Sequence, residues 1–201
     1  MNLLQKMDAF RDQASWAVWR TDGAGALTGD VEFPLDAATE AANDRAMIVA
    51  LNPGGISTPG ASPTPDWSNF HNPNPKHNDI FLAHAFIDTP YWGAYMTDLH
   101  PDLVESNSGL VRPRREAVRS AVASLIDQGR ILGSVETIVC LGAKCHSAVL
   151  GRRREIEAAL GAVVIARVPH YSRSNAGVHK HDAQRYRKLV LQAIDSSDRH
   201  G

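Results

Sequence analysis

Short apolar runs alternate along the chain with stretches whose apolar residues have helical spacing. A run that is apolar on both faces and bounded by turn residues predicts a buried strand, whereas apolar residues three or four apart predict a helix. By these criteria we expect strands at residues 46–51, 93–98, 137–141 and 162–168. We expect helices at residues 3–20, 79–86, 112–132, 143–150, 155–160 and 181–194.

The alternation of strands and helices predicts the fold class. A helix that connects two parallel strands packs on the sheet, so the pattern favours an α/β protein. We predict a single-domain, three-layer α/β sandwich around a central, mostly parallel sheet of four strands. A chain of 201 residues fits one domain, spanning 1–201, with residues 3–20 as its N-terminal helix. Residues 31–34 are compatible with a short edge strand.

Three of the predicted strands end in polar residues. Asn52 follows the first strand, Asp98 closes the second, and His170 follows the last. Open α/β sheets bind ligands beyond the carboxyl ends of their strands, so we expect these side chains to converge on one cleft. The proline-rich segment 52–78 has no hydrophobic periodicity and is predicted to be an active-site loop. The alternative is that these residues are ordinary turn formers, because polar residues follow strands in every α/β protein.

Composition excludes several classes of protein. Cys140 and Cys145 are the only cysteines, too few for a disulfide framework or a four-cysteine iron–sulfur cluster. The histidines have no recognised metal-binding spacing, so no metal or other cofactor is expected. No apolar run reaches membrane-spanning length, and the N-terminus lacks the features of a signal peptide. We therefore expect a cytoplasmic monomer without a membrane partner.

The net charge of −1 conceals an asymmetry between the two halves of the chain. Residues 1–108 contain 5 Lys or Arg against 14 Asp or Glu, a net charge of −9. Residues 109–201 contain 16 against 8, a net charge of +8. A basic half can supply contacts to phosphates, so the asymmetry favours DNA as a partner. The alternative is that these charges lie on solvated helix faces, or that the two halves neutralise each other.

Four short motifs occur in the order in which a known family carries them. They are Asn52-Pro53-Gly54, Phe70-His71-Asn72-Pro73, Tyr95-Met96-Thr97-Asp98 and His170-Tyr171-Ser172. In this order they resemble the motifs of the uracil-DNA glycosylase superfamily, in particular its mismatch-specific and single-strand-selective Asn-Pro-Gly type. The resemblance covers roughly residues 45–190. It implies a uracil-DNA glycosylase-like fold and an enzyme that hydrolyses the bond between sugar and base.

The resemblance also implies roles for individual residues. Asn52 matches the asparagine that positions the attacking water, and His170 matches the histidine that donates to or polarises the departing base. Phe70 lies in the region that carries the base-stacking aromatic residue, with Trp67 as the second choice. The candidates for contact with the DNA backbone, in and beyond the loop after His170, are Ser172, Arg173, Ser174 and Lys180.

Asp98 departs from the family pattern, which commonly places a base-reading Asn at this position, beside Tyr95. An ionised Asp only accepts hydrogen bonds, so it suits the N4 amine of cytosine and not the O4 acceptor of uracil. A protonated Asp could also reach cytosine N3 if burial raises its pKa. Gly54 and Gly55 stand where uracil-specific relatives carry a bulky aromatic residue, which leaves room for a substituent on carbon 5. The alternative is that Asp98 caps the following loop or pairs with an arginine.

These features predict a monofunctional DNA glycosylase that flips a base out of the helix and excises it without a metal. The expected base is a 5-modified cytosine, for example glucosylated hydroxymethylcytosine in phage DNA, which points to antiviral defence. One alternative is a uracil or mismatch DNA glycosylase. The other is a non-catalytic nucleic-acid-binding module of the same fold.

Overall fold

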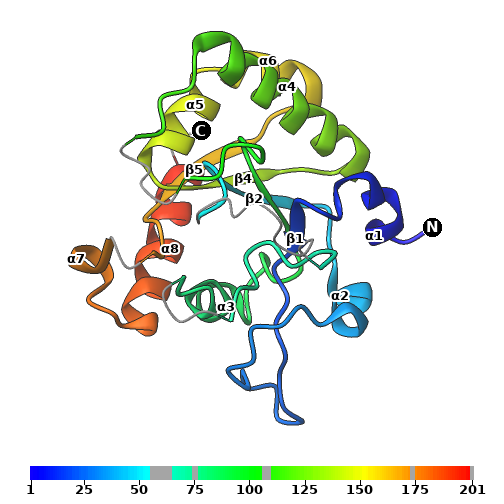
Figure 1. The fold of residues 1–201 in the computed structure, drawn as a ribbon, viewed down its shortest axis with the longest axis vertical. Helices are drawn as coiled ribbons and strands as arrows, with labels where there is room; N and C mark the ends of the chain where they lie inside the picture. Colours follow the sequence, from blue (N-terminus) through cyan, green and yellow to red (C-terminus); the bar gives the residue numbers. More distant parts are fainter. Residues whose placement is uncertain (55–64, 74–76, 106–109, 173–174, 200–201) are drawn as a thin grey trace.

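The computed structural model describes residues 1–54, 65–73, 77–105, 110–172 and 175–199. Its centre is a five-stranded sheet with the strand order β1-β3-β2-β4-β5 (Figure 1). The strands are β1 (Ala14–Trp16), β2 (Ala46–Ala50), β3 (Tyr95–Asp98), β4 (Thr137–Leu141) and β5 (Val164–Val168). β1 pairs antiparallel with β3, and all other neighbours are parallel. The prediction of a mostly parallel α/β sheet is confirmed, but the sheet has five strands, not four.

Helices cover both faces of the sheet. On one face lie α4 (Arg115–Leu132), α5 (Ala143–Leu150) and α6 (Arg153–Leu160), and on the other lie α3 (Ile80–Phe86) and α8 (Ala183–Asp198) (Figure 1). The remaining helices are α1 (Leu3–Lys6), the 3₁₀ helix η1 (Asp8–Phe10), α2 (Leu35–Ala41) and α7 (Ala176–His179). No helix in the described ranges has both the length and the apolar character needed to cross a membrane.

Each face of the sheet has its own hydrophobic core. In β2, Met47 and Val49 point into the core beneath α4, whereas Ile48 and Ala50 point into the core shared with α3 and α8. All five residues of β2 are buried. A strand covered on both faces requires apolar residues at every position, which is why its sequence reads as a continuous apolar run.

The predicted N-terminal helix over residues 3–20 is wrong. α1 ends at Lys6, and Ala14–Trp16 form the edge strand β1 instead. Every residue of β1 is buried, and Trp16 packs edge-on against Tyr95 with ring centroids 5.3 Å apart. Residues 14–19 are all buried, so they do not present the polar face that a surface helix exposes to water. Pairing with β3 also supplies hydrogen-bond partners to an otherwise open sheet edge.

Two predictions for the segments around β2 have different outcomes. Residues 31–34 form no strand, and the chain instead enters the unpredicted helix α2 at Leu35. In the predicted loop 52–78, the described parts contain neither helix nor strand. The chain after β2 therefore reaches α3 without regular structure in any part that the structure describes.

Candidate functional site

The carboxyl ends of the parallel strands bring three of the predicted site residues to one edge of the sheet. Ala50 in β2 pairs with Asp98 in β3, so Asn52 lies two residues beyond that pair. His170 lies two residues beyond the end of β5, and its ring carbon Cδ2 would be 3.9 Å from a Cβ at Gly142, the residue after β4. The structure thus places Asn52, Asp98 and His170 on the same side of the molecule.

The amide group of Asn52 is held in a defined orientation. Its Nδ2 atom donates to the main-chain carbonyls of Pro53, Leu103 and Glu105 at 2.9, 2.9 and 2.8 Å. The loop after β3 is itself tied to this segment, because the amide of Glu105 donates to the carbonyl of Pro53 at 3.3 Å. With the nitrogen facing these carbonyls, the amide oxygen Oδ1 points away from them and can accept a hydrogen bond.

His170 is held as a neutral imidazole. The backbone amide of Ser172 donates to its Nδ1 atom at 3.1 Å, so Nδ1 carries no proton and Nε2 does. Burial lowers the pKa of His170 to about 4. Its ring stacks on that of Tyr171 with centroids 4.6 Å apart and planes 13° apart. At neutral pH the residue therefore offers one N–H donor, at Nε2.

Asp98 is a buried carboxyl group at the end of β3, with 3 % of its surface exposed. Its Oδ2 atom accepts from Nδ2 of Asn69 at 2.8 Å, while Oδ1 has no hydrogen-bond partner among the described residues. Burial and, to a smaller extent, the negative charge of Asp79 raise the pKa of Asp98 to about 7, against the lowering effect of the hydrogen bond from Asn69. The carboxyl group therefore exists in both protonation states near neutral pH. The alternative role of Asp98 as a partner of an arginine has no support in these contacts.

Asp79 is a second buried carboxyl group that the sequence did not suggest as a site residue. It immediately precedes α3, yet its side chain makes no capping hydrogen bond to that helix. Instead, Oδ2 accepts from the backbone amide of Asn72 at 2.7 Å. In the sequence it resembles a helix N-cap, because an Asp before a helical apolar run commonly caps it. Only the folded structure shows that it lies near Asp98 and Tyr171.

The two aromatic candidates for base stacking lie in different cores. Phe70 is buried in the same core as Tyr171, next in the chain to Asn69, which binds Asp98. Trp67 belongs to the core on the other face of the sheet, with its ring centroid 6.0 Å from that of Trp16. Of the two, Phe70 is the aromatic residue on the side of the sheet that carries Asp98 and Tyr171.

Tyr95 does not join the other candidates. It is three residues before Asp98 in the same strand, and alternate residues of a strand point to opposite faces. Its ring lies in the core beneath α4, and its hydroxyl donates to Oε1 of Gln128 at 3.0 Å. The structure therefore gives Tyr95 a packing role on the face opposite Asp98, and the predicted base contact for it is corrected on this ground.

The remaining predicted residues lie near this edge or outside the described ranges. Gly54 is exposed, and a Cβ there would be 4.0 Å from Nδ1 of His77. The carbonyl of Ser172 accepts from Asn175, and Lys180 is exposed at the end of α7. The predictions for Gly55, Arg173 and Ser174 fall outside the residues that the structure describes.

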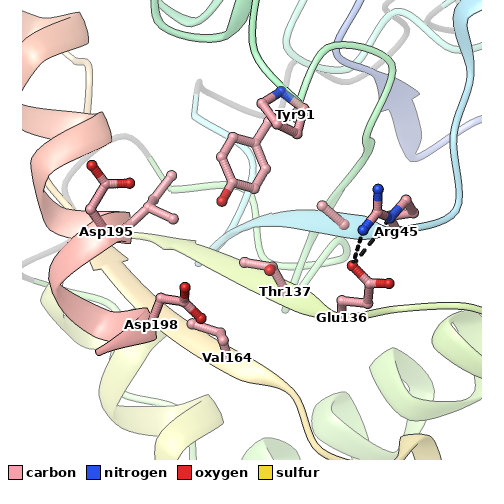
Figure 2. A pocket seen from close by; sticks show the side chains of 10 residues that line it. Arg45, Tyr91, Glu136, Thr137, Val164, Asp195 and Asp198 are labelled. Atoms are coloured by element: carbon pink, nitrogen blue, oxygen red, sulfur yellow. Dashed lines mark hydrogen bonds and ion pairs between the residues drawn. The ribbon is translucent and has the colours of Figure 1, made fainter. Parts of the chain in front are cut away.

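A cavity of about 260 Å³ lies at the opposite, amino ends of the strands (Figure 2). Figure 2 shows the carboxylates of Asp195 and Asp198 on α8 facing this space, with the Tyr91 hydroxyl between them and the ion pair of Arg45 with Glu136. Open α/β sheets bind ligands at the other edge, and no candidate residue lies here.

A second cavity, of about 310 Å³, lies just beyond the carboxyl end of β2, between the starts of α4 and α5. It is lined by Leu51, Val111, Pro113, Val118, Ala143, Lys144, Ser147 and Ala148. Neither cavity is lined by Asp98 or His170. Because Asp98 is almost fully buried, a ligand reaches it only after covering side chains move.

In the parts of the chain that the structure describes, no three His, Cys, Asp or Glu side chains are placed to hold a metal ion. Asp79 and Asp98 provide two carboxyl groups without a third ligand of these types. The arrangement suits chemistry by hydrogen bonding: a fixed amide, a neutral imidazole and buried carboxyl groups.

No protein-family model matches the chain, and a search of curated proteins finds no match.

Proposed function

We propose that this protein is a monofunctional DNA glycosylase of the uracil-DNA glycosylase type, which hydrolyses the bond between a flipped base and its sugar. The observation that carries the proposal is the fixed amide of Asn52 at the same sheet edge as the neutral His170. These are the two residues that the motif resemblance identifies as catalytic. The uracil-DNA glycosylase-like arrangement of the sandwich belongs to the same proposal.

In the proposed reaction, water attacks the anomeric carbon of the sugar while the base leaves. Asn52 is not a general base, because an amide does not take up a proton at neutral pH. Its Oδ1 atom accepts a hydrogen bond from the water and orients it, so its contribution is positional and electrostatic. Orientation requires a rigid amide, and the three carbonyls that bind Nδ2 supply that rigidity.

His170 stabilises the departing base. The negative charge that develops on the base is spread onto its oxygen, and the Nε2–H group of His170 donates to that oxygen. The proton position follows from the hydrogen bond of the Ser172 amide to Nδ1. Because the pKa of His170 is about 4, the donor is a neutral imidazole throughout the physiological pH range.

The proposed substrate is a cytosine with a substituent on carbon 5, such as glucosylated hydroxymethylcytosine in phage DNA. We infer cytosine as the base from Asp98. Its ionised form accepts a hydrogen bond from the N4 amine, and its protonated form donates one to N3. We infer the substituent on carbon 5 from Gly54, because the loop has no side chain at this position that would exclude it. Phe70 provides a ring for stacking once the base has left the duplex. Excision of such a base would serve defence against phages.

A uracil or mismatch glycosylase is the second candidate, and the pKa of Asp98 favours it. With a pKa of about 7, a large fraction of Asp98 is protonated at neutral pH. A protonated carboxyl group both donates and accepts, as the amide of an asparagine does. It could therefore bind O4 and N3–H of uracil in the manner expected of the family's usual Asn.

The test is mass spectrometry of the bases released from DNA. Duplex and single-stranded oligonucleotides would carry uracil, cytosine, 5-hydroxymethylcytosine or its glucosylated form. Release of a modified cytosine supports the proposal, and preferential release of uracil supports the second candidate. DNA binding without release of any base would leave the non-catalytic module as the function and overturn the enzyme.

A further inference from the structure

Asp79 occupies a helix N-cap position without acting as a cap. An Asp at this position normally accepts from the first backbone amides of its helix. Asp79 has 3 % of its surface exposed, and its Oδ2 atom accepts from Asn72 of the preceding loop. Its Oδ1 atom is buried without a hydrogen bond of good geometry among the described residues, and the Tyr171 hydroxyl is the neighbouring group that interacts with this carboxyl.

Asp98 repeats this arrangement. Asn69, in the same loop as Asn72, binds one oxygen of Asp98, and the other oxygen is buried without a partner in the described ranges. The two carboxyl groups are close enough for the charge of Asp79 to act on Asp98, and both act on the phenol of Tyr171. Buried oxygens without partners are costly, and a ligand that donates hydrogen bonds removes that cost.

We propose that Asp79 is a second base-reading residue, so that Asp79 and Asp98 together bind the amino edge of a flipped cytosine-type base. This inference rests on the proposed glycosylase function. An amino group on a ring presents two N–H donors, and the adjacent ring nitrogen presents an acceptor. Two carboxyl groups that share one proton offer acceptors for the amine and one O–H donor for the ring nitrogen.

A uracil edge fits this pair less well. The O4 atom of uracil is a hydrogen-bond acceptor. The two carboxyl groups offer it at most one donor, because they share a single proton. The pair therefore discriminates in favour of cytosine more strongly than Asp98 alone. The charge of Asp79 raises the pKa of Asp98, and His77 and Tyr171 lower that of Asp79. In turn, Asp98 raises the pKa values of Tyr171 and Cys145.

The variant Asp79→Asn separates a reading role from a structural one. Its amide oxygen can still accept from the Asn72 amide, so the loop contact is retained while the acceptor pair is lost. We expect release of modified cytosine to fall about tenfold or more relative to release of uracil, with an unchanged melting temperature or a higher one. The matched control is Asp182→Asn, because Asp182 caps α8 with hydrogen bonds to Gln184 and Arg185. The control should leave base preference unchanged.

A second measurement does not depend on catalysis. Carbon-13 NMR of the Asp carboxyl carbons would follow Asp79 and Asp98 during pH titration and on addition of free cytosine or uracil. We expect the pKa of Asp98 to fall in Asp79→Asn, and cytosine to shift both signals of the wild type more than uracil does. If Asp98 titrates unchanged in Asp79→Asn, or if cytosine shifts only Asp98, the second reading residue is overturned.

The two measurements distinguish the inference from the proposed function. If no base is released from any DNA but cytosine shifts both carboxyl signals, the glycosylase fails and the amine-binding pair stands. If modified cytosine is released equally by wild type and Asp79→Asn, the glycosylase stands and the inference about Asp79 is overturned.

Discussion

At the scale of single residues, Asn52 shows how packing fixes the orientation of a side chain that has no acid–base chemistry. Its amide binds three carbonyls of the loops that follow β2 and β3. The orientation of its oxygen is thus a consequence of how two loops pack. Asn43 makes a comparable contact elsewhere, where its Nδ2 atom donates to the carbonyl of Trp92 at 2.6 Å.

The first prediction compares these two asparagines. Asn52→Ala and Asn43→Ala each remove donors to main-chain carbonyls, so each should lower the free energy of unfolding by about 1–2 kcal/mol. Only Asn52→Ala should lower the single-turnover rate of base release, by about a hundredfold or more. Denaturant unfolding and single-turnover kinetics on both variants check this. A rate unchanged in Asn52→Ala would remove Asn52 from the reaction.

The second prediction concerns the pH dependence of stability caused by Asp98. Its pKa is raised from 3.8 to about 7 in the folded protein. Between these values the folded state binds more protons than the unfolded state, so Asp98 makes stability fall as pH rises. Above about pH 7 the loss is complete and amounts to at most about 4 kcal/mol.

Asp98→Asn keeps an acceptor for Asn69 and removes the charge. It should match the wild type in stability near pH 4 and exceed it at pH 8, as measured by urea unfolding across this range. His71 and His170, whose pKa values are lowered by burial to about 4, act in the opposite direction but are common to both proteins. The difference between the two curves therefore isolates Asp98. A constant difference across the range would show that Asp98 titrates normally.

At the scale of secondary-structure elements, the sequence predicts the strands that are buried on both faces. It misses elements whose burial depends on residues far away in the chain. β2 and β4 read directly from their apolar runs because both faces are covered. β1 is buried because it pairs with β3 and packs on Trp67, which a local pattern cannot reveal. Helix α2 was missed because no apolar stripe of helical spacing marks its short sequence; only Ala38 in it is buried.

The candidate site divides in the same way. Asn52, Asp98 and His170 could be predicted because each ends or follows a strand, and the topology then brings strand ends together. Tyr95 could have been excluded, since a residue three positions from Asp98 in a strand points to the other face. Asp79 could not be found, because its place beside Asp98 depends on the path of the long loop before α3.

The third prediction tests whether the close contact between Gly93 and the end of α2 positions β3. Gly93 precedes β3 with a φ of +82°, and a Cβ there would overlap the carbonyl oxygen of Ala41 and lie 2.8 Å from its carbon. Gly25 has the same φ of +82°, with no atom within 4 Å of a Cβ. Gly25→Ala should cost only the backbone strain of about 1–2 kcal/mol.

Gly93→Ala adds a steric clash between α2 and β3, and should cost about 2–5 kcal/mol in total. Because β3 carries Asp98, the variant should also reduce base release, whereas Gly25→Ala should not. Thermal unfolding and the base-release assay measure both effects. Equal destabilisation by the two substitutions would mean that the end of α2 moves without cost and does not fix β3.

At the scale of the whole molecule, charge is distributed along the strand direction. Exposed Arg112, Arg114 and Arg115 lie at the start of α4, close to the carboxyl edge, where Lys144 donates to the carbonyl of Val111 at 3.1 Å. None of the ion pairs between described residues involves these three arginines. The acidic side chains of Asp195 and Asp198 line the cavity at the amino edge (Figure 2).

This polarity matches the proposed direction of DNA approach. The carboxyl edge carries Asn52 and His170 and has exposed arginines nearby that can bind phosphates, whereas Asp195 and Asp198 at the amino edge would repel them. The alternative that the two halves neutralise each other has one instance among the ion pairs of the described residues, Arg45 with Glu136 at 2.6 Å. Other basic residues pair within the basic half itself. Arg130 pairs with Asp127 at 3.2 Å, and Arg152 pairs with Glu155 at 2.7 Å.

The fourth prediction uses this difference between paired and unpaired arginines in one helix. Arg114 and Arg115 begin α4 without ion pairs in the described ranges, whereas Arg130 lies in its last turn, paired with Asp127. The double variant Arg114→Ala/Arg115→Ala should weaken DNA binding on all sequences alike and reduce the slope of log K against log salt by about 1–2. Arg130→Ala should change neither quantity, because it lies far along the helix from the proposed interface.

Fluorescence anisotropy with a labelled oligonucleotide, measured from low to moderate salt, gives both affinity and slope. A steep slope that the double variant reduces and the control retains places the backbone contacts at the carboxyl edge. A salt dependence that is flat in the wild type would remove DNA as the substrate. A steep slope that neither variant changes would place the DNA on another face, and Asn52 and His170 would then lie outside the interface.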